Sequence, residues 1–400
     1  MGSTLSREKQ KQSICITLGW GAKKPLLYIN EYLNMKFLII KFNGGKMEIK
    51  VTRADRIGTR PKDADLGFGT AFTDHMFVMD YSKDLGWHDP RIEPYANFSM
   101  SPAAMVLHYG QAIFEGLKAY KTPDKKIQLF RARDNFARMN RSARGLCIPE
   151  LDIDLVMDAL KKLVKLEEHW IPETLGTSLY IRPTIIATDP FLGVRSSFTF
   201  KFYIILCAVG AYYAEGFNPV KIWVSKDHVR AVRGGVGEFK TAGNYAASLN
   251  ASEKAKKQGY AQVLWLDALE MKYIEEVGAM NIFFIINGEI LTPNLSGSIL
   301  PGITRYSVIA LAQKWGMKVS ERKISLDEIF SAHANGQLTE VFGSGTAAVI
   351  SPVGEIRYGD RVMNIGDGTP GKTAMKFYDA LTAIQYGKSE DTENWVEVID

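Results

Sequence analysis

A lysine in a glycine-rich setting is the residue of this sequence that is best placed for covalent chemistry. Lys240 lies in the segment GGVGEFKTAGNY, residues 234–245, between a glycine-rich turn and small residues that open a helix. An amine that attacks a carbonyl must lose its proton, and burial among glycines and aromatic rings disfavours the charged form. The segment favours nucleophilic chemistry by Lys240, although most lysines before a helix are simply solvated.

Two further side chains could act on a ligand that this lysine holds. Tyr245 follows Lys240 by five residues, at the start of the expected helix, where its phenol could reach an oxygen of the ligand. Glu276 lies in the segment YIEEVGAMN, at the end of an expected strand just before a glycine, and a carboxylate there could pair with a protonated ring nitrogen of a cofactor. An edge-strand glutamate in solvent is the plainer interpretation of Glu276 taken alone.

Two glycine-containing turns could bind anions through backbone N–H groups. In SILPGITRYSV the amides of Ile303 and Thr304 open a helix directly after Pro301 and Gly302, which is a natural place for a phosphate. In FGSGTAAV, residues 342–349, the turn around Thr346 could offer further N–H donors. Each segment is also compatible with an ordinary turn or a capped helix.

Two arginines complete the candidate set. Arg182 lies in the strand-like segment LYIRP, where burial of a guanidinium is costly unless an anion accompanies it. Arg138 lies on an expected helix, residues 134–146, which we expect to begin with Asp134 as its N-cap; a surface position is equally compatible with Arg138.

Segments of different periodicity would position these residues. Strands are predicted over 126–132, 178–188 and 198–209, and an amphipathic helix over 152–171. A segment rich in glycine and aromatic residues then separates two halves. The second half reads as strands over 220–225, 262–267, 273–277, 281–286 and 289–293, with a helix over 304–316. We therefore expect a basic extension over 1–46 that is disordered or non-native, a small α/β domain over 47–209, a linker over 210–220 and a larger domain over 221–400.

Charge and cysteine content exclude several classes of protein. Of 49 Lys and Arg and 44 Asp and Glu, residues 1–46 hold eight and two, which leaves 41 and 42 in the remainder. The body of the chain is therefore nearly neutral and predicts no nucleic-acid surface. Cys15, Cys147 and Cys207 are scattered and without a CxxC, which fits a reducing, cytoplasmic compartment. The six histidines show no metal-ligand spacing, and no apolar run reaches the length of a membrane span.

The basic extension allows more than one interpretation. It begins MGSTLS, a loose match to a myristoylation signal, with lysines after it that could act as a second membrane signal. A mitochondrial presequence, an added tag or a start codon upstream of Met47 are the alternatives, and the single arginine argues against a presequence.

Taken together, the motifs resemble those of a known family. Lys240, Tyr245, Glu276 and the two anion-binding turns occur with FTDHM, LHYGQAIFEGLKAY, TSLYIRP, LGV, QVLWLD, EVGAMN and LPGITR in an order that is similar to branched-chain amino-acid aminotransferases. These are class IV aminotransferases of fold type IV, with the two-domain α/β (α+β) fold of D-amino-acid aminotransferase. The resemblance runs from about Gly67 to the last residues.

The resemblance implies a role for each residue around pyridoxal 5'-phosphate. Lys240 would form the internal aldimine and carry a proton between the substrate Cα and the cofactor's C4′. Tyr245 would hydrogen-bond the phenolate oxygen, and Glu276 would keep the pyridine nitrogen protonated. The phosphate would be held by Arg138, Ile303, Thr304 and Thr346. The substrate would meet Tyr109, Phe114, Tyr180, Arg182, Tyr212, Thr346 and Ala347, while Leu192 and Val194 of the LGV segment would reach the pocket of the neighbouring subunit in a homodimer.

The implied activity is transfer of the amino group of L-leucine, L-isoleucine or L-valine to 2-oxoglutarate, giving glutamate, in a ping-pong cycle. A D-amino-acid aminotransferase or an aminodeoxychorismate lyase would keep the fold and change the substrate. A binding protein that acts on membranes or nucleic acid through the basic extension is the alternative from another class. Two departures from the family stand out: Ala279 replaces a common threonine, and Ala348 and Ser351 replace a redox-sensing cysteine pair, so thiol regulation is not expected there.

Overall fold

The computed structural model describes residues 26–30, 37–41, 47–210 and 217–399 of the chain. It divides into two compact units, Met1–Glu48 and Ile49–Asp400. In the first unit, strands β1 (Leu26–Asn30) and β2 (Phe37–Lys41) pair antiparallel. The disorder or non-native origin of residues 1–46 stays a prediction, because this hairpin accounts for only part of them.

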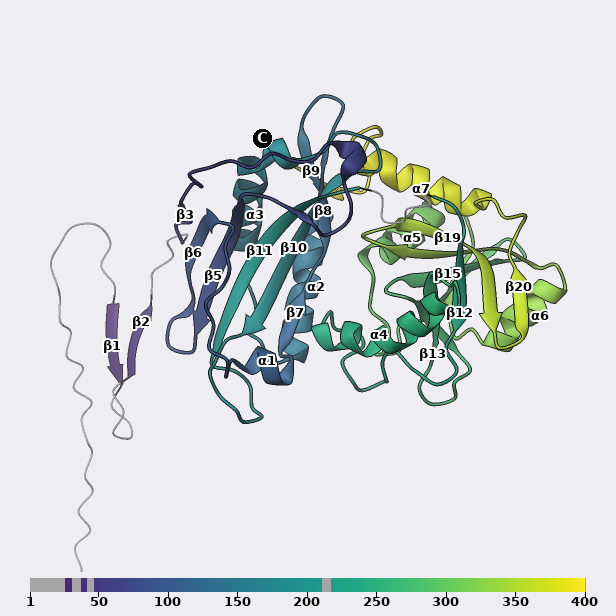
Figure 1. The fold of residues 1–400 in the computed structure, drawn as a ribbon, viewed down its shortest axis with the longest axis horizontal. Helices are drawn as coiled ribbons and strands as arrows, with labels where there is room; N and C mark the ends of the chain where they lie inside the picture. Colours follow the sequence, from purple (N-terminus) through teal and green to yellow (C-terminus); the bar gives the residue numbers. More distant parts are fainter. Residues whose placement is uncertain (1–25, 31–36, 42–46, 211–216, 400) are drawn as a thin grey trace, which may run out of the picture. The chain divides into compact units, whose positions relative to one another are not determined.

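The second unit begins with a ten-stranded sheet, which we call the first sheet (Figure 1). Its strands are β3 (Lys50–Val51), β4 (Ala71–Phe72), β5 (His75–Ser82), β6 (Gly86–Pro94), β7 (Ala112–Phe114), β8 (Leu117–Lys121), β9 (Ile127–Phe130), β10 (Ser178–Ala187), β11 (Thr199–Val209) and β21 (Val396–Ile399). They follow the order β21-β9-β8-β10-β11-β5-β6-β3, with β4 paired to β11 and β7 to β10. Burial alternates along β10, so one face of the sheet is packed and the other carries partly exposed side chains.

Helices cover the packed face of the first sheet. Helix α2 (Ala132–Gly145) and helix α3 (Ile153–Leu166) contribute Phe136, Met139 and Leu160 to one core with the strands. The short helices α1 (Met105–Tyr109), η1 (Asp63–Asp65) and η2 (Glu168–Trp170) lie in the connections. The start of α2 differs from our expectation: Asp134 lies within the first turn and Arg131 is the N-cap, with its side chain bonded to the Asp134 carboxylate.

The second sheet has nine strands in the described part of the chain. They are β12 (Val220–Val224), β13 (Gln262–Leu266), β14 (Ile274–Val277), β15 (Asn281–Ile286), β16 (Glu289–Pro293), β17 (Val319–Arg322), β18 (Leu338–Gly345), β19 (Val349–Tyr358) and β20 (Arg361–Asn364). The order is β14-β13-β12-β19-β18-β15-β16-β17, with β20 paired to β19. Parallel and antiparallel pairs both occur, as between β12 and β13 and between β15 and β18.

Both faces of the second sheet are covered, which explains why β15 is an unbroken apolar run. Phe284 points into a core with helix α6 (Leu326–Ala334), whereas Phe283 points into a core with helices α5 (Ile303–Lys314) and α7 (Lys372–Gln385). Neighbouring residues of a strand face opposite sides, so a strand buried on both sides is apolar throughout. Helix α4 (Ala242–Lys257) packs separately against β13.

Contacts join the two sheets into one unit. Tyr120 of β8 and Phe130 of β9 belong to the same core as α5 and α7, and β21 returns from beyond α7 to pair with β9. The proposed division at residues 210–220 stays a prediction, and residues 211–216 of that linker lie outside the described residues. Among the described helices, none combines the length and the apolar character that crossing a membrane demands.

Candidate active site

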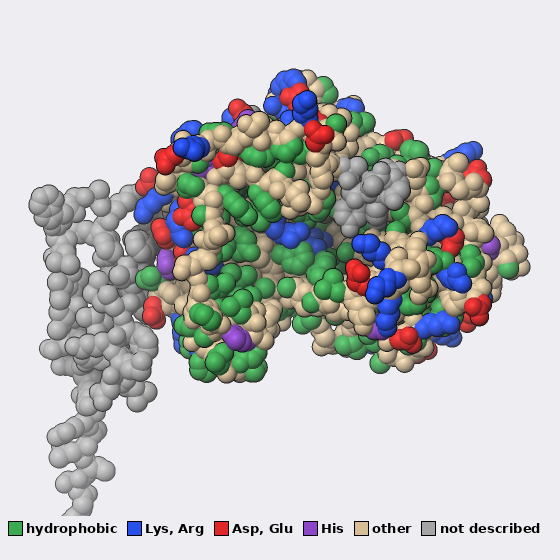
Figure 2. Space-filling model, viewed as in Figure 1, with side chains coloured by type: hydrophobic (Ala, Val, Ile, Leu, Met, Phe, Trp, Pro, Cys, Tyr) green, Lys and Arg blue, Asp and Glu red, His purple; other side chains and the backbone are tan. Residues whose placement is uncertain are grey.

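A cavity of about 240 Å³ lies between the two sheets and collects residues from both. On the face drawn in Figure 2 a hollow separates the two halves of the unit, with hydrophobic, Lys and Arg side chains within it. Most of the residues singled out in the sequence line the cavity: Phe114, Arg138, Tyr180, Arg182, Lys240, Tyr245, Glu276, Ile303, Thr304, Thr346 and Ala347.

Lys240 and Tyr245 meet at the floor of this cavity. Lys240 precedes α4, and Tyr245 is one helical turn further on, so the Lys240 Nζ donates a hydrogen bond of 2.8 Å to the Tyr245 Oη. The ring of Phe114 lies 4.9 Å from Nζ and 4.8 Å from the tyrosine ring. The Lys240 backbone is fixed by Ser142 and Phe114, which bond its N–H and its carbonyl. Among the described residues that line the cavity, the only side-chain amine is thereby held beside a phenol.

Glu276 closes the side of the cavity that faces the second sheet. It is a buried residue of β14, and Asn281 donates to its Oε1 over 3.2 Å. The Arg230 Nε lies 2.5 Å from Oε2 as an ion pair, in an orientation that makes no hydrogen bond. Burial raises the pKa of Glu276 to about 7, although the nearby Arg230 acts in the opposite direction. Its Oε2 is therefore a buried oxygen that can still accept a hydrogen bond.

The start of α5 and Arg138 form a second polar corner. Ile303 and Thr304 are the first residues of α5, whose opening N–H groups have no acceptor within the helix. Arg138 lies beside them and donates to the carbonyl of Pro301 over 3.2 Å. Gly302 lets the Asn281 side chain lie close to this corner, because a Cβ there would lie 2.0 Å from the Asn281 Oδ1. The corner combines a guanidinium with the positive end of a helix, as anion binding requires.

Alternation along β10 places Tyr180 and Arg182 on the open face of the first sheet. The Arg182 Nη2 donates to the Tyr180 Oη over 3.1 Å, and its guanidinium lies 4.8 Å from the Phe114 ring centroid. Its buried Nε has no hydrogen-bond partner among the described residues. Gly116 leaves room for the phenol, since a Cβ there would lie 2.1 Å from the Tyr180 Oη. Arg182 thus presents an unused donor beside aromatic rings.

The turn between β18 and β19 closes the cavity opposite these residues. Thr346 and Ala347 are in the turn, and Val349 completes it with a φ of 61°, which is unusual for a β-branched residue. Lys118 of β8 reaches across from the first sheet and donates to the Ala347 carbonyl over 2.8 Å. Burial lowers the pKa of Lys118 to about 8.

Three of the expected site residues do not line the cavity. Tyr109 at the end of α1, Leu192 and Val194 are exposed, by 41%, 67% and 89% of their surface. Tyr212 lies outside the described residues. The described part of a single chain therefore builds the cavity without Tyr109, Leu192 and Val194.

Sequence reasoning missed four charged or polar neighbours of the site: Glu115, Lys118, Arg230 and Asn281. Glu115 accepts two hydrogen bonds from Arg138, both of 2.8 Å. A signal for the first two was present, because Glu115 and Lys118 interrupt the apolar run AIFEGLKAY, where an unpaired charge would be costly to bury. Arg230 and Asn281 gave no comparable signal.

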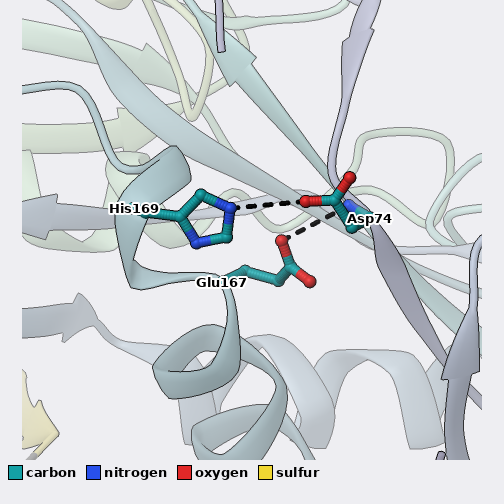
Figure 3. Close-up of side chains that lie close together, drawn as sticks. All are labelled: Asp74, Glu167 and His169. Carbon is teal, nitrogen blue, oxygen red and sulfur yellow. Dashed lines mark hydrogen bonds and ion pairs between the residues drawn. The ribbon is translucent and has the colours of Figure 1, made fainter. Parts of the chain in front are cut away.

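A separate polar cluster lies on the first sheet away from the cavity (Figure 3). Carboxylate and imidazole atoms of Asp74, Glu167 and His169 approach within 4.8 Å of one another. Their oxygens already accept protein hydrogen bonds: Asp74 from the Gly58 N–H and the Trp170 Nε1, and Glu167 from the Asp74 N–H. This cluster is explained by its role in holding loops to the sheet.

Comparison with known proteins identifies the family. The model of the amino-transferase class IV family matches residues 112–356. The chain belongs to this family. Its site residues from Phe114 to Thr346 all fall within the matched range, and the resemblance seen in the motifs is confirmed.

Named relatives and solved structures narrow the group within class IV. Branched-chain-amino-acid aminotransferase 2 of Bacillus subtilis is 57% identical over 88% of this chain and 96% of its own length, and transaminase 1 of the same strain is 55% identical over 85% and 96%. The crystal structure of the Escherichia coli branched-chain amino acid aminotransferase matches with a TM-score of 0.69 at 27% identity, covering 82% of this chain and 99% of that one. The T.th. enzyme, solved with pyridoxamine 5'-phosphate, matches with a TM-score of 0.66 at 27% identity, covering 80% and 98%. The expected fold is confirmed, and the chain belongs among the branched-chain aminotransferases.

Proposed function

We propose that the protein transfers the amino group of L-leucine, L-isoleucine or L-valine to 2-oxoglutarate with pyridoxal 5'-phosphate. The observation that carries this proposal is the Lys240 amine held against the Tyr245 phenol in a cavity that also contains Glu276 and an anion-binding corner. Relatives that are more than half identical over most of the chain bear the name of this activity.

The cavity suits the cofactor because two of its buried polar atoms make no hydrogen bond to any described residue. Glu276 Oε2 and the buried Ser344 Oγ, which has no hydrogen-bond partner in the described part of the chain, both belong to residues that line it. When bound, the cofactor supplies an electron sink that stabilises negative charge at the substrate's Cα. Lys240 would hold its aldehyde carbon, Tyr245 its phenolate oxygen and Glu276 its ring nitrogen.

The phosphate would occupy the corner between Arg138 and α5. The N–H groups of Ile303 and Thr304 point along the helix axis at its positive end, and Thr346 would contribute from the opposite turn. Anchoring at this end, away from Lys240, would fix the orientation of the ring.

Lys240 would then move the proton in each half-reaction. Once its Nζ is released, the amine can take the proton from the substrate's Cα and return it to the cofactor's carbon, since both lie along the reach of one flexible side chain. The Tyr245 hydroxyl, 2.8 Å away, would keep Nζ oriented between these two positions.

The substrate would lie between the two sheets. Its α-carboxylate would meet the N–H groups of Thr346 and Ala347, in the turn that Lys118 holds from behind. Phe114 and Tyr180 would contact an aliphatic side chain, while Arg182 would receive the second carboxylate of glutamate or 2-oxoglutarate.

A homodimer would account for the exposed residues of the expected site. Tyr109, Leu192 and Val194 are exposed together with other large apolar side chains of the same two segments, Leu107 and Phe191. An exposed apolar surface of this kind is typical of a subunit interface. We further propose a cytoplasmic location, which the unpaired thiols of Cys147 and Cys207 support.

A visible absorbance spectrum with and without L-leucine tests the proposed activity. The purified protein should be yellow, should lose this absorbance when L-leucine is added, and should regain it with 2-oxoglutarate. Borohydride should fix the cofactor to Lys240, as peptide mass analysis would show, and Lys240→Ala should fold yet lose both the colour and the turnover. Normal turnover by Lys240→Ala would rule out the proposed role of this lysine.

A further inference from the structure

Arg138 is held by a carboxylate for which the proposed reaction has no use. We propose that Glu115 is a positioning residue that aims the Arg138 guanidinium at the phosphate of the cofactor. The proposal rests on the phosphate role proposed above for Arg138. Glu115 itself does not line the cavity, so it would act only through the arginine.

The hydrogen bonds of Arg138 within the described part of the chain leave a single donor for a ligand. A guanidinium has five N–H donors. Glu115 takes one from Nε and one from Nη2 at 2.8 Å each, Asn135 takes the second of Nη2 at 3.4 Å, and Pro301 takes one from Nη1 at 3.2 Å. One N–H of Nη1 remains, on a side chain that lines the cavity. The two-point contact with Glu115 fixes the plane of the guanidinium and therefore the direction of this last donor.

Glu115 is itself rigidly held. It lies between β7 and β8, its backbone N–H donates to the Pro183 carbonyl over 2.8 Å, and its Oε2 also accepts the Gly116 N–H at 3.2 Å. Glu115 is fully buried and Arg138 is 6% exposed. A charge pair at this depth is constrained, because separating the partners would leave two unpaired buried charges.

Glu115 could instead only neutralise the charge of Arg138. The sign of the change in phosphate affinity distinguishes this role from positioning. If the carboxylate only neutralised the charge of Arg138, it would weaken phosphate binding, and its removal would tighten it. A positioning role predicts that the protein binds phosphate less well when a carboxylate of the same charge is placed differently. Glu115→Asp shortens the side chain by one methylene, so it keeps the charge and moves the carboxylate.

The experiment measures the dissociation constants of pyridoxal 5'-phosphate and of pyridoxal, which lacks the phosphate, on cofactor-free full-length protein. Glu115→Asp should weaken binding of the phosphorylated cofactor about tenfold or more, the loss expected for one charge-assisted hydrogen bond. Binding of pyridoxal should change by less than about twofold, since no other contact to the cofactor is altered. Glu167→Asp is the matched control, because Glu167 is equally buried in the same unit, bonds His75 and lies away from the cavity; it should change neither constant.

Each other outcome overturns a stated part of the argument. Unchanged or tighter binding of the phosphorylated cofactor by Glu115→Asp would overturn the positioning role. Equal weakening of both ligands would also overturn it, because Glu115 would then support the cavity in general. Arg138→Met distinguishes failure of the positioning role from failure of the proposed function. If this variant binds both ligands as the wild type does, Arg138 does not hold the phosphate. If it loses only the phosphorylated ligand while Glu115→Asp does not, the positioning role alone is wrong.

Discussion

At the scale of single residues, the cavity must accept both a branched aliphatic side chain and the second carboxylate of glutamate. We propose that Arg182 resolves this conflict, because its guanidinium carries an Nε donor that no described residue uses, while its flat face lies against Phe114 and Tyr180. A purely apolar wall would leave the carboxylate unpaired, at a cost of several kcal/mol.

Arg182→Met should therefore weaken glutamate and 2-oxoglutarate far more than leucine. Loss of a charge-assisted pair from a desolvated site predicts a difference of about 2 kcal/mol, or more than tenfold in kcat/KM. The two half-reactions can be followed separately through the cofactor's absorbance. An equal loss for both substrates would mean that Arg182 binds a group they share, which would contradict this account.

Glu276 should make the stability of the cofactor-free protein depend on pH. Burial raises its pKa from 4.5 to about 7, so the folded state holds this proton more tightly than the unfolded state. The contribution to stability is complete below pH 4.5 and is lost as the pH rises through 7. Relative to Glu276→Gln, the free energy of unfolding of the wild type should fall by about 3 kcal/mol across this range.

Denaturant unfolding of both cofactor-free proteins at several pH values between about 5 and 8 measures this difference. The substitution leaves Arg230 without its partner, but that arginine stays charged throughout and shifts the curve by a constant. Parallel curves for the two proteins would contradict the raised pKa.

The sequence predicts a site residue only where a local pattern marks it. Lys240, Tyr245 and Glu276 lie in distinctive segments, and the structure gathers them in one cavity. Glu115 and Lys118 find their partners 23 and 229 residues away, which no local pattern specifies. Their presence in an apolar run of the sequence showed only that partners had to exist.

At the scale of elements, helix α5 and strand β15 meet where the phosphate is expected. Gly302 precedes α5, and Asn281 at the start of β15 bonds both Glu276 and the Leu300 carbonyl. A Cβ on residue 302 would lie 2.0 Å from the Asn281 Oδ1, so the amide would have to move.

Gly302→Ala should therefore disturb the phosphate corner and the ring-nitrogen side of the cavity together. We expect at least about tenfold weaker binding of pyridoxal 5'-phosphate, the loss of roughly one well-placed hydrogen bond. Gly243→Ala is the matched control, because that glycine of α4 has open space around it. Fluorescence titration of the cofactor-free proteins measures both, and unchanged binding in Gly302→Ala would show that Asn281 can move freely.

Element type followed from periodicity, whereas boundaries did not. The strand over 281–286 is apolar throughout because both faces of its sheet are covered, whereas LYIRP alternates because one face of its sheet is open. The helix that follows Asp152 is capped by the Asp152 side chain, as its sequence suggests. The start of α2 was misplaced, because Asp134 has the chemistry of an N-cap but serves as a first-turn partner of Arg131.

At the scale of the whole molecule, the excess positive charge and the site belong to different units. Residues 1–46 carry the excess charge and none of the cavity-lining residues. A chain that begins at Met47 should keep its activity within about twofold, since chain ends often contribute little to the ordered body. Steady-state assays with L-leucine compare the two lengths, and an insoluble or inactive shorter chain would contradict this expectation.

No sequence pattern predicted the pairing of β21 with β9. Strand β21 is short, and all strands of the second sheet lie between it and its partner β9 in the sequence.

This pairing has a consequence for synthesis on the ribosome. Chains fold as they emerge, and N-terminal regions usually complete first. Here the first sheet exposes an open edge at β9 while the whole second sheet is still being translated, and it is completed only when Val396–Ile399 have left the exit tunnel. The edge that awaits its last strand is where a nascent chain of this protein is most open to capture by chaperones or by another nascent copy.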